Sequence, residues 1–260
     1  MSRPGGSGRL HRPIITLTTD FGTRDYYVAA MKAVLVRDCP QSRLIDVTHE
    51  VPRHDILCGS ITLERAIDGF LPGTVHLAVV DPGVGTDRRV LVTELNRQTI
   101  VCPDNGLITW AWRRLGPGNA YELTWRPRTS SNTFHGRDVM APAAAMLARG
   151  DRLADLARPI DDPVLLDISP APRHSASARI IHLDIFGNAT TNLSYDRIAR
   201  GTSFRVRQNR LGKLRRTYWD VPPGKPLALI GSSGLLEIAV RDGSAAKQLK
   251  LKVGDEVTVE

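Results

Sequence analysis

Three aspartates stand at comparable places in the first third of the sequence. Asp20, Asp46 and Asp81 each come at the end of a short apolar, β-branched run. In a parallel sheet the carboxyl ends of the strands lie along one edge, which is where open α/β folds bind ligands. The three carboxylates are therefore predicted to belong to a site there, although aspartate at such places is also a common helix N-cap or turn former. Their hard oxygen atoms would suit Mg²⁺, so a metal-dependent phosphohydrolase is one candidate activity.

One of the seven histidines has a distinctive setting. His135 lies in the stretch T-F-H-G-R-D, directly before a predicted helix, where an imidazole is accessible for acid–base chemistry. Four motifs do not occur in the strand, turn or helix context that their chemistry requires: G-x-G-x-x-G, G-x-x-x-x-G-K-[ST], H-E-x-x-H and G-x-S-x-G. Dinucleotide-dependent, P-loop, zincin-type and nucleophile-elbow enzymes are therefore not expected.

The elements that must position these residues alternate in type through the first half of the chain. Apolar, β-branched runs predict strands over residues 14–19 and 74–80, and helical spacing of apolar residues predicts helices over 26–37 and 56–70. Strands that alternate with helices of this length indicate a mostly parallel sheet with helices on both faces.

The second half follows a different pattern. A helix is predicted over residues 139–148, and a proline-rich linker over 159–173 follows it. Beyond the linker, short strand-like segments are separated by Gly, Asn and Pro turns, as in a small β-barrel. We therefore expect an α/β chain with a flexible tail (1–12), an N-terminal α/β domain (13–165) and a C-terminal β-barrel domain (175–260).

Composition narrows the class of protein further. The chain has 260 residues and a net charge of +8, but its basic residues are dispersed and form no recognition motif, so nucleic acid is not expected as a partner. The three cysteines form no C-x-x-C pair, which argues against a disulfide framework and a zinc cluster. No apolar stretch is long enough to span a membrane, and the first twelve residues lack the apolar core of a secretory signal. A cytoplasmic location is expected.

Seven stretches, in order, resemble one enzyme family. They are T-T-D-F-G (18–22), D-V-T-H-E (46–50), D-P-G-V-G-T-D-R-R (81–89), P-D-N-G (103–106), T-F-H-G-R-D (133–138), D-I-F-G-N (184–188) and S-S-G-L-L-E (232–237). With these motifs the chain, over residues 13 to 260, is similar to the S-adenosylmethionine (SAM) hydrolases, or SAM hydroxide adenosyltransferases, which are related to the SAM-dependent fluorinase and chlorinase. That family has an N-terminal α/β domain and a C-terminal β-barrel.

The resemblance implies that water displaces methionine from C5′ of SAM, which gives adenosine and L-methionine. The leaving group is a neutral thioether and needs no general acid, whereas water needs polarisation or a base. The family's Asp–Arg–His set carries over to Asp81, Arg88 and His135. Arg88 and His135 are expected to bind and polarise the water, and Asp81 to orient and charge-balance them. Arginine stays protonated, so His135 as base, or a captured hydroxide, is preferred to Arg88 as base.

The resemblance also implies substrate contacts. Asp20 matches the residue that binds the ribose diol, and Asp184 and Ser232 match positions that hold the methionine amino and carboxylate groups. The adenine-facing positions of the family correspond to Phe186, Asn188, Glu237 and Val240. One further substrate-binding position corresponds to Asn105. Taken alone, Phe186 and Val240 could be core residues, and Asn188 could belong to an ordinary turn.

Two further activities remain open at this stage. A halogenase would need small, preorganised donors for its halide, whereas His135 followed by Gly136 agrees with the hydrolases. A non-catalytic sensor of SAM or adenosine would keep the pocket without turnover. The resemblance implies a homotrimer with sites between subunits, SAM as substrate, and neither a cofactor nor a metal.

Overall fold

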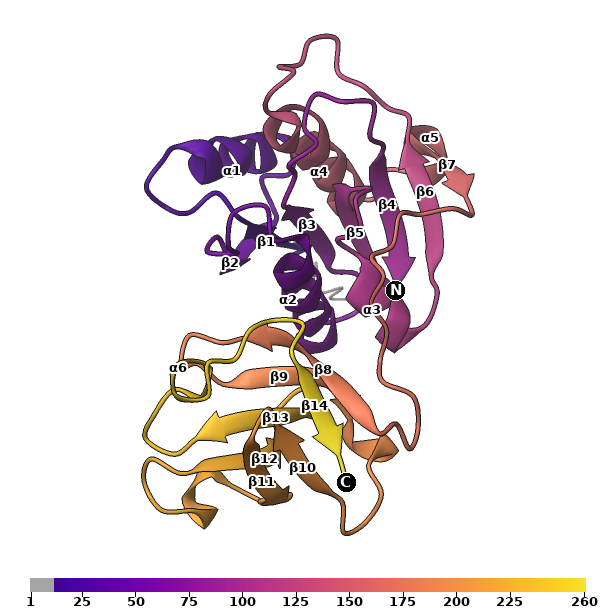
Figure 1. Ribbon diagram of the computed structural model, residues 1–260. Coiled ribbons are helices and arrows are strands. Elements are labelled where there is room, and N and C mark those ends of the chain that lie inside the picture. Colours follow the sequence, from indigo (N-terminus) through magenta and orange to yellow (C-terminus); the bar gives the residue numbers. More distant parts are fainter. Residues whose placement is uncertain (1–11) are drawn as a thin grey trace, which may run out of the picture. The chain divides into compact units, whose positions relative to one another are not determined.

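The computed structural model describes residues 12–260 (Figure 1). The predicted flexible tail, residues 1–12, lies outside the described residues except for Arg12. The chain divides after Leu166 into two compact units, an N-terminal α/β unit and a C-terminal β unit. Each unit is described separately below.

The N-terminal unit is built on a seven-stranded mixed sheet with the strand order β2-β1-β3-β5-β4-β6-β7. Strands β2, β1, β3 and β5 are parallel to one another, whereas β4, β6 and β7 join the sheet in antiparallel pairs. The strands are β1 (Ile14–Thr19), β2 (Arg43–Thr48), β3 (Val75–Val79), β4 (Val90–Leu95), β5 (Gln98–Pro103), β6 (Asn119–Leu123) and β7 (Ala157–Ile160). The expectation of a mostly parallel sheet is confirmed.

Helices cover both faces of this sheet. The helices are α1 (Tyr27–Asp38), α2 (Ile56–Gly69), α3 (Thr109–Leu115), α4 (Ala141–Arg149), the short α5 (Leu153–Leu156) and a π-helical turn, η1 (Gly136–Met140). Alternate residues of β3 enter different cores: Leu77 and Val79 pack with α1 and α4, whereas Ala78 packs with α2 and α3. Because both faces of the sheet are covered, all five residues of β3 are buried. Each of them is either apolar or hydrogen-bonded. Among residues 12–260, no helix combines the length and apolar character needed to cross a bilayer.

The C-terminal unit is an antiparallel, nearly closed barrel, as expected. Its strand order is β11-β10-β14-β8-β9-β13-β12. The Arg215 amide donates to the Ala228 carbonyl (2.8 Å), which links the two ends of this order. Phe204, Leu236 and Ile238 fill the interior. The elements are β8 (Ser177–Leu183), β9 (Ala189–Ser194), η2 (Tyr195–Arg197), β10 (Ser203–Val206), β11 (Asn209–Lys213), η3 (Tyr218–Asp220), β12 (Pro226–Ile230), β13 (Leu235–Val240), α6 (Ala245–Gln248) and β14 (Glu256–Val259).

One of the three strand-end aspartates is placed differently from the prediction. Asp46 lies inside β2, two residues before its end, because β2 keeps pairing with β1 as far as Thr48 and Thr18. Its partly exposed carboxylate accepts a hydrogen bond from Lys32 Nζ (2.6 Å), and its Oδ1 lies 3.0 Å from His49 Nε2. Burial acts to raise the pKa of Asp46, but the bonds from Lys32 and His49 outweigh it and lower that pKa.

A buried ion pair fastens the end of the N-terminal unit to its sheet. Arg89, just before β4, donates from Nε to Oδ2 of Asp104 (2.7 Å), whose side chain is 1% exposed. The other carboxylate oxygen of Asp104 accepts the Val164 amide (2.8 Å). The Arg89 guanidinium also contacts the exposed carboxylate and the backbone carbonyl of Asp162, both at 2.7 Å. Arg89 therefore joins the strand β4, the loop after β5 and the chain near residue 162.

Replacing Arg89 by Ala should destabilise the protein strongly. Asp104 would stay buried without its cation, and removing one partner of a buried pair costs on the order of 3 kcal/mol of the free energy of unfolding. Asp162→Asn is the matched control, because its side chain is 71% exposed and exposed pairs contribute less than about 1 kcal/mol. Thermal and urea unfolding of both variants would measure the difference; equal losses would contradict this account.

Candidate active site

The loop after β3 brings a carboxylate and a guanidinium together. Asp81 follows β3 by two residues, and Arg88 reaches back to it, with Nε 2.8 Å from Oδ1 and Nη2 in contact with Oδ2. The two side chains are 5% and 10% exposed, so the pair is shielded from water. Bidentate pairing of this kind fixes the direction of both groups. The carboxylate accepts two charge-assisted hydrogen bonds from the guanidinium.

Local turns make this approach possible. The Val84 amide donates to the Asp81 carbonyl (3.3 Å), and the Thr86 hydroxyl donates to the Gly83 carbonyl (2.7 Å). Gly85 adopts a φ of +83°, and a Cβ atom there would lie 2.6 Å from the Asn132 carbonyl oxygen. Only glycine fits this close approach. The loop over residues 81–88 therefore packs directly against the segment that leads to His135.

Asn105 supports the end of β3. Its side-chain amide donates from Nδ2 to the Val80 carbonyl (2.8 Å), and its Oδ1 accepts the Leu107 amide (3.3 Å). Both ends of the amide are thus engaged within the N-terminal unit, one residue from Asp81. This geometry indicates that Asn105 positions the strand end that carries Asp81. Its predicted role in substrate binding remains a prediction.

His135 joins the pair from a different part of the chain. It precedes η1, and its Nδ1 lies 3.3 Å from Arg88 Nη2. A guanidinium can only donate, so Nδ1 accepts, and a neutral ring then carries its proton on Nε2. Burial, followed by the positive charge of Arg88, lowers the pKa of His135 from its ordinary value. The imidazole is therefore neutral at pH 7 and offers an N–H donor beside the guanidinium.

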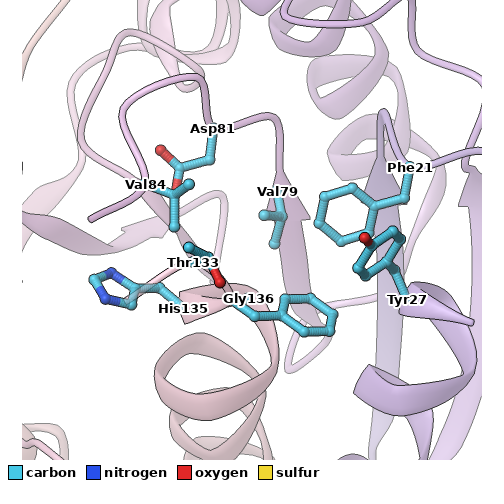
Figure 2. A pocket seen from close by; sticks show the side chains of 9 residues that line it. Phe21, Tyr27, Val79, Asp81, Val84, Thr133, His135 and Gly136 are labelled. Carbon is cyan, nitrogen blue, oxygen red and sulfur yellow. The ribbon is translucent and has the colours of Figure 1, made fainter. Parts of the chain in front are cut away.

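Asp81 and His135 line a pocket of about 170 Å³ in the N-terminal unit (Figure 2). Asp81 and His135 lie on one side of it, and Phe21 and Tyr27 lie on the other, with Val79 between them. The remaining lining residues are Val84, Thr133, Phe134 and Gly136. Sequence reasoning did not assign Phe21 or Tyr27 to the site, although Phe21 stands beside Asp20 in the T-T-D-F-G stretch.

The three aspartates do not form one cluster. Asp20 and Asp46 are not among the pocket-lining residues. Asp20 Oδ2 accepts the His54 amide (2.9 Å), Asp46 pairs with Lys32 and His49, and Asp81 pairs with Arg88. In the described part of the chain, no three His, Cys, Asp or Glu residues are grouped so that they could hold a metal ion.

In the C-terminal unit, Asp184 organises a tight turn. Its Oδ1 accepts the amides of Phe186 (2.9 Å) and Asn188 (2.8 Å), and its Oδ2 accepts Asn188 Nδ2 (3.0 Å). Gly187 has a φ of +83°, and a Cβ atom there would meet Ser244. Phe186 is consequently presented at the surface, 71% exposed, and is not a core residue. An exposed ring on a rigid turn can stack on a planar ligand.

The other residues predicted in this unit lie on or beside β13. Ser232 is exposed in the turn before β13, and Val240, at its end, is buried in the barrel core. Glu237 accepts a hydrogen bond from the Tyr218 hydroxyl (2.7 Å). Burial, followed by that bond, raises the pKa of Tyr218 to about 12, so the phenol remains a donor. Tyr218 was missed in the sequence because it lies in an irregular stretch far from β13.

Known proteins match almost the whole chain. The curated relatives include (R)-S-adenosyl-L-methionine hydrolases from Salinispora arenicola (42% identical, 95% of this chain and 97% of the relative) and Thermus thermophilus (41%, 94% and 97%). A fluorinase from Actinopolyspora mzabensis is more distant, at 25% identity over 95% of this chain and 97% of its own. A crystal structure of an uncharacterized conserved protein from Thermotoga maritima has a TM-score of 0.87 at 34% identity, covering 95% of this chain and all of that one.

Two family models divide the chain in sequence order. The model of the SAM hydroxide adenosyltransferase N-terminal domain matches residues 15–157, and that of the C-terminal domain matches residues 178–258. Together they take in the strand ends, the Asp81–Arg88–His135 group and the barrel. The chain belongs to the SAM hydroxide adenosyltransferase family.

Proposed function

We propose that this protein is an enzyme that hydrolyses S-adenosyl-L-methionine to adenosine and L-methionine. The observation that carries the proposal is the shielded Asp81–Arg88 pair with His135 against it, at a pocket that Asp81 and His135 line. The names of the hydrolase relatives specify the R configuration. We therefore propose the epimer with the R configuration at sulfur as the preferred substrate.

The geometry supports activation of water by hydrogen-bond donors. Arg88 donates to Nδ1 of His135 and so keeps the ring proton on Nε2, and this Nε2–H can donate to the oxygen of a bound water, which favours its hydroxide character. Asp81 has both carboxylate oxygens on Arg88, so it orients and balances the guanidinium and does not take the proton. Water oxygen then bonds to C5′, the C5′–S bond breaks with its electron pair on sulfur, and one proton is released to solvent.

The remaining predicted contacts are part of this proposal. Asp20 would bind the ribose diol, because a carboxylate can accept two hydroxyl protons. Phe186 and Asn188, with Glu237 and Val240, would hold adenine, while Asp184 and Ser232 would hold the methionine end. Phe186 has the clearest structural support, since its ring is exposed on a turn fixed by Asp184.

The alternatives receive less support. A metal-dependent phosphohydrolase would need Asp20, Asp46 and Asp81 together, and each of these carboxylates has its own partner elsewhere. A halogenase would need small, preorganised donors for a dehydrated halide, whereas this site presents the imidazole of His135, whose Nδ1 accepts from Arg88. A sensor would bind SAM without producing adenosine.

The purified protein should release adenosine and methionine in equal amounts from SAM, and faster from the R than from the S epimer. Arg88→Met should reduce kcat by about a hundredfold or more, because it removes the donor that orients His135 and leaves the shielded Asp81 carboxylate without its cation. Asp81→Asn should have a similar effect, with the affinity for SAM nearly kept. Chromatographic detection of adenosine measures the rates of the wild type and of both variants. Binding without turnover in the wild type would establish the sensor, and loss in EDTA would establish the metal enzyme.

The activity should fall on the acid side with a midpoint below pH 6.5. Burial and Arg88 lower the pKa of His135 from 6.5, so the ring is neutral at pH 7 and gains its proton only below the ordinary value. Protonated Nδ1 would place a second cation against Arg88 and break their contact. His135→Gln, which keeps a donor and an acceptor but cannot titrate, should retain part of kcat/KM and lose this acid limb. An unchanged acid limb in the His135→Gln variant, or a wild-type pH profile with its midpoint above pH 6.5, would refute the assignment of this limb to His135.

We further propose a cytoplasmic homotrimer whose sites combine residues of different chains. The support is that Asp81, Arg88 and His135 belong to the N-terminal unit, whereas Phe186, Asn188, Ser232 and Glu237 belong to the C-terminal unit. A ring of identical chains can close such heterologous contacts.

Mixing two inactive variants should restore activity. Arg88→Ala and Asn188→Ala each damage a different half of the site, so some mixed trimers would contain one intact site after subunit exchange. Light scattering would give the mass, and labelled chains would verify the exchange. Absence of recovery despite exchange, or a fully active monomer, would reject the trimer.

A further inference from the structure

Aromatic side chains are concentrated at one wall of the pocket. Only 5% of the residues of the chain are Phe, Trp or Tyr, yet Phe21, Tyr26, Tyr27 and Phe134 meet there. The rings of Phe21 and Tyr27 have centroids 5.9 Å apart, and each meets Phe134 edge-on, at 5.9 and 5.3 Å. Tyr26 stacks on Tyr27 at 4.8 Å. We call Phe21, Tyr27 and Phe134 the aromatic wall.

The wall faces the catalytic group across the pocket. Figure 2 shows Phe21 and Tyr27 on the side opposite Asp81 and His135, with Val79 between the two sides. This placement matters for a displacement reaction, because the nucleophile and the leaving group lie on opposite sides of the reacting carbon. If water is held at His135, the sulfur attached to C5′ must point away from that side of the pocket. In this pocket that direction leads towards the aromatic wall.

The sulfur of the substrate carries a positive charge that the pocket must accommodate. Asp81 is the only acid among the described residues that line the pocket, and both of its oxygens are engaged by Arg88. The residues that line the pocket therefore carry no net negative charge that could balance the sulfonium of the substrate. The faces of aromatic rings carry negative potential and attract cations without a formal charge.

One ring of the wall already holds a cation. The Arg137 guanidinium carbon lies 5.0 Å from the centroid of Phe134, and its charge is balanced by Asp138 at 2.6 and 2.8 Å. One face of Phe134 is thus occupied by the protein itself. Phe21 and Tyr27 remain for the substrate, and Tyr27 is held between Tyr26 and Phe134, so its orientation is set before binding.

We propose that Phe21 and Tyr27 bind the sulfonium of the substrate through cation–π contacts and so select the charged substrate over neutral thioethers. This inference rests on the proposed hydrolysis of SAM. As water oxygen bonds to C5′, the electron pair of the C5′–S bond moves to sulfur, the positive charge there disappears, and the water proton passes to solvent. The contact is strongest before the reaction and weakens as the neutral thioether forms. The two rings therefore contribute to substrate affinity and product release, and they do not accelerate the chemical step.

The test compares a charged and a neutral ligand in ring-removing variants. Phe21→Leu and Tyr27→Leu should each raise KM for SAM about tenfold, with kcat changed less than about twofold. The inhibition constant of S-adenosylhomocysteine, a neutral thioether, should rise less than about threefold. Tyr27→Phe is the matched control, because it keeps the ring and loses only the hydroxyl, and both constants should stay at wild-type values. Thermal unfolding would verify that the variants are folded.

A second measurement keeps the shape of the ring. Phenylalanines with one to five fluorine atoms at position 21 weaken the negative face in steps, and log KM for SAM should rise linearly along the series. A flat series, or equal losses for SAM and S-adenosylhomocysteine in the Leu variants, would overturn the proposal and leave only apolar packing. Failure of the wild type to produce adenosine would instead reject the proposed hydrolysis, so the two failures are distinguishable.

Discussion

The bidentate contact between Asp81 and Arg88 is the interaction on which the rest of the site depends. Both groups are largely shielded from water, so each requires the other: an unpaired charge at either position would be costly. The pair cancels the net charge of the lining, fixes the direction of the guanidinium, and makes Nδ1 of His135 an acceptor. From this single contact follow the tautomer of the imidazole and the need for another means of holding a cationic substrate.

The scaffold places this pair with little freedom. Strand β3 is buried on both faces, and Asn105 anchors the Val80 carbonyl immediately before Asp81. Arg89, next to Arg88, is fastened to Asp104, so the chain on both sides of the loop is fixed. Sites supported by rigid strands and by a second layer of hydrogen bonds hold reacting groups in geometry that loops alone do not.

The periodicity of apolar residues was sufficient to predict the architecture of the α/β unit and of the barrel, because buried parallel strands and barrel strands leave strong apolar patterns. Asp81 and His135 could be proposed from their places at a strand end and before a helix, whereas Arg88 needed the family resemblance. Asp46 was misplaced, since a strand end depends on its partner's length. Phe21, Tyr27 and Phe134 were missed as a group because contacts between residues more than a hundred positions apart leave no local pattern. The antiparallel strands β4, β6 and β7 were not anticipated either, because apolar runs do not reveal the direction in which a strand pairs.

The close approach of Gly85 to the Asn132 carbonyl has an evolutionary consequence. The two loops that carry Arg88 and His135 touch through bare backbone, with no side chain between them to absorb a change. An insertion or deletion in one loop would displace the other, so their lengths cannot drift independently. New specificities in this scaffold should therefore arise by exchange of side chains around the pocket, while changes in loop length are tolerated only where the two loops are remodelled together.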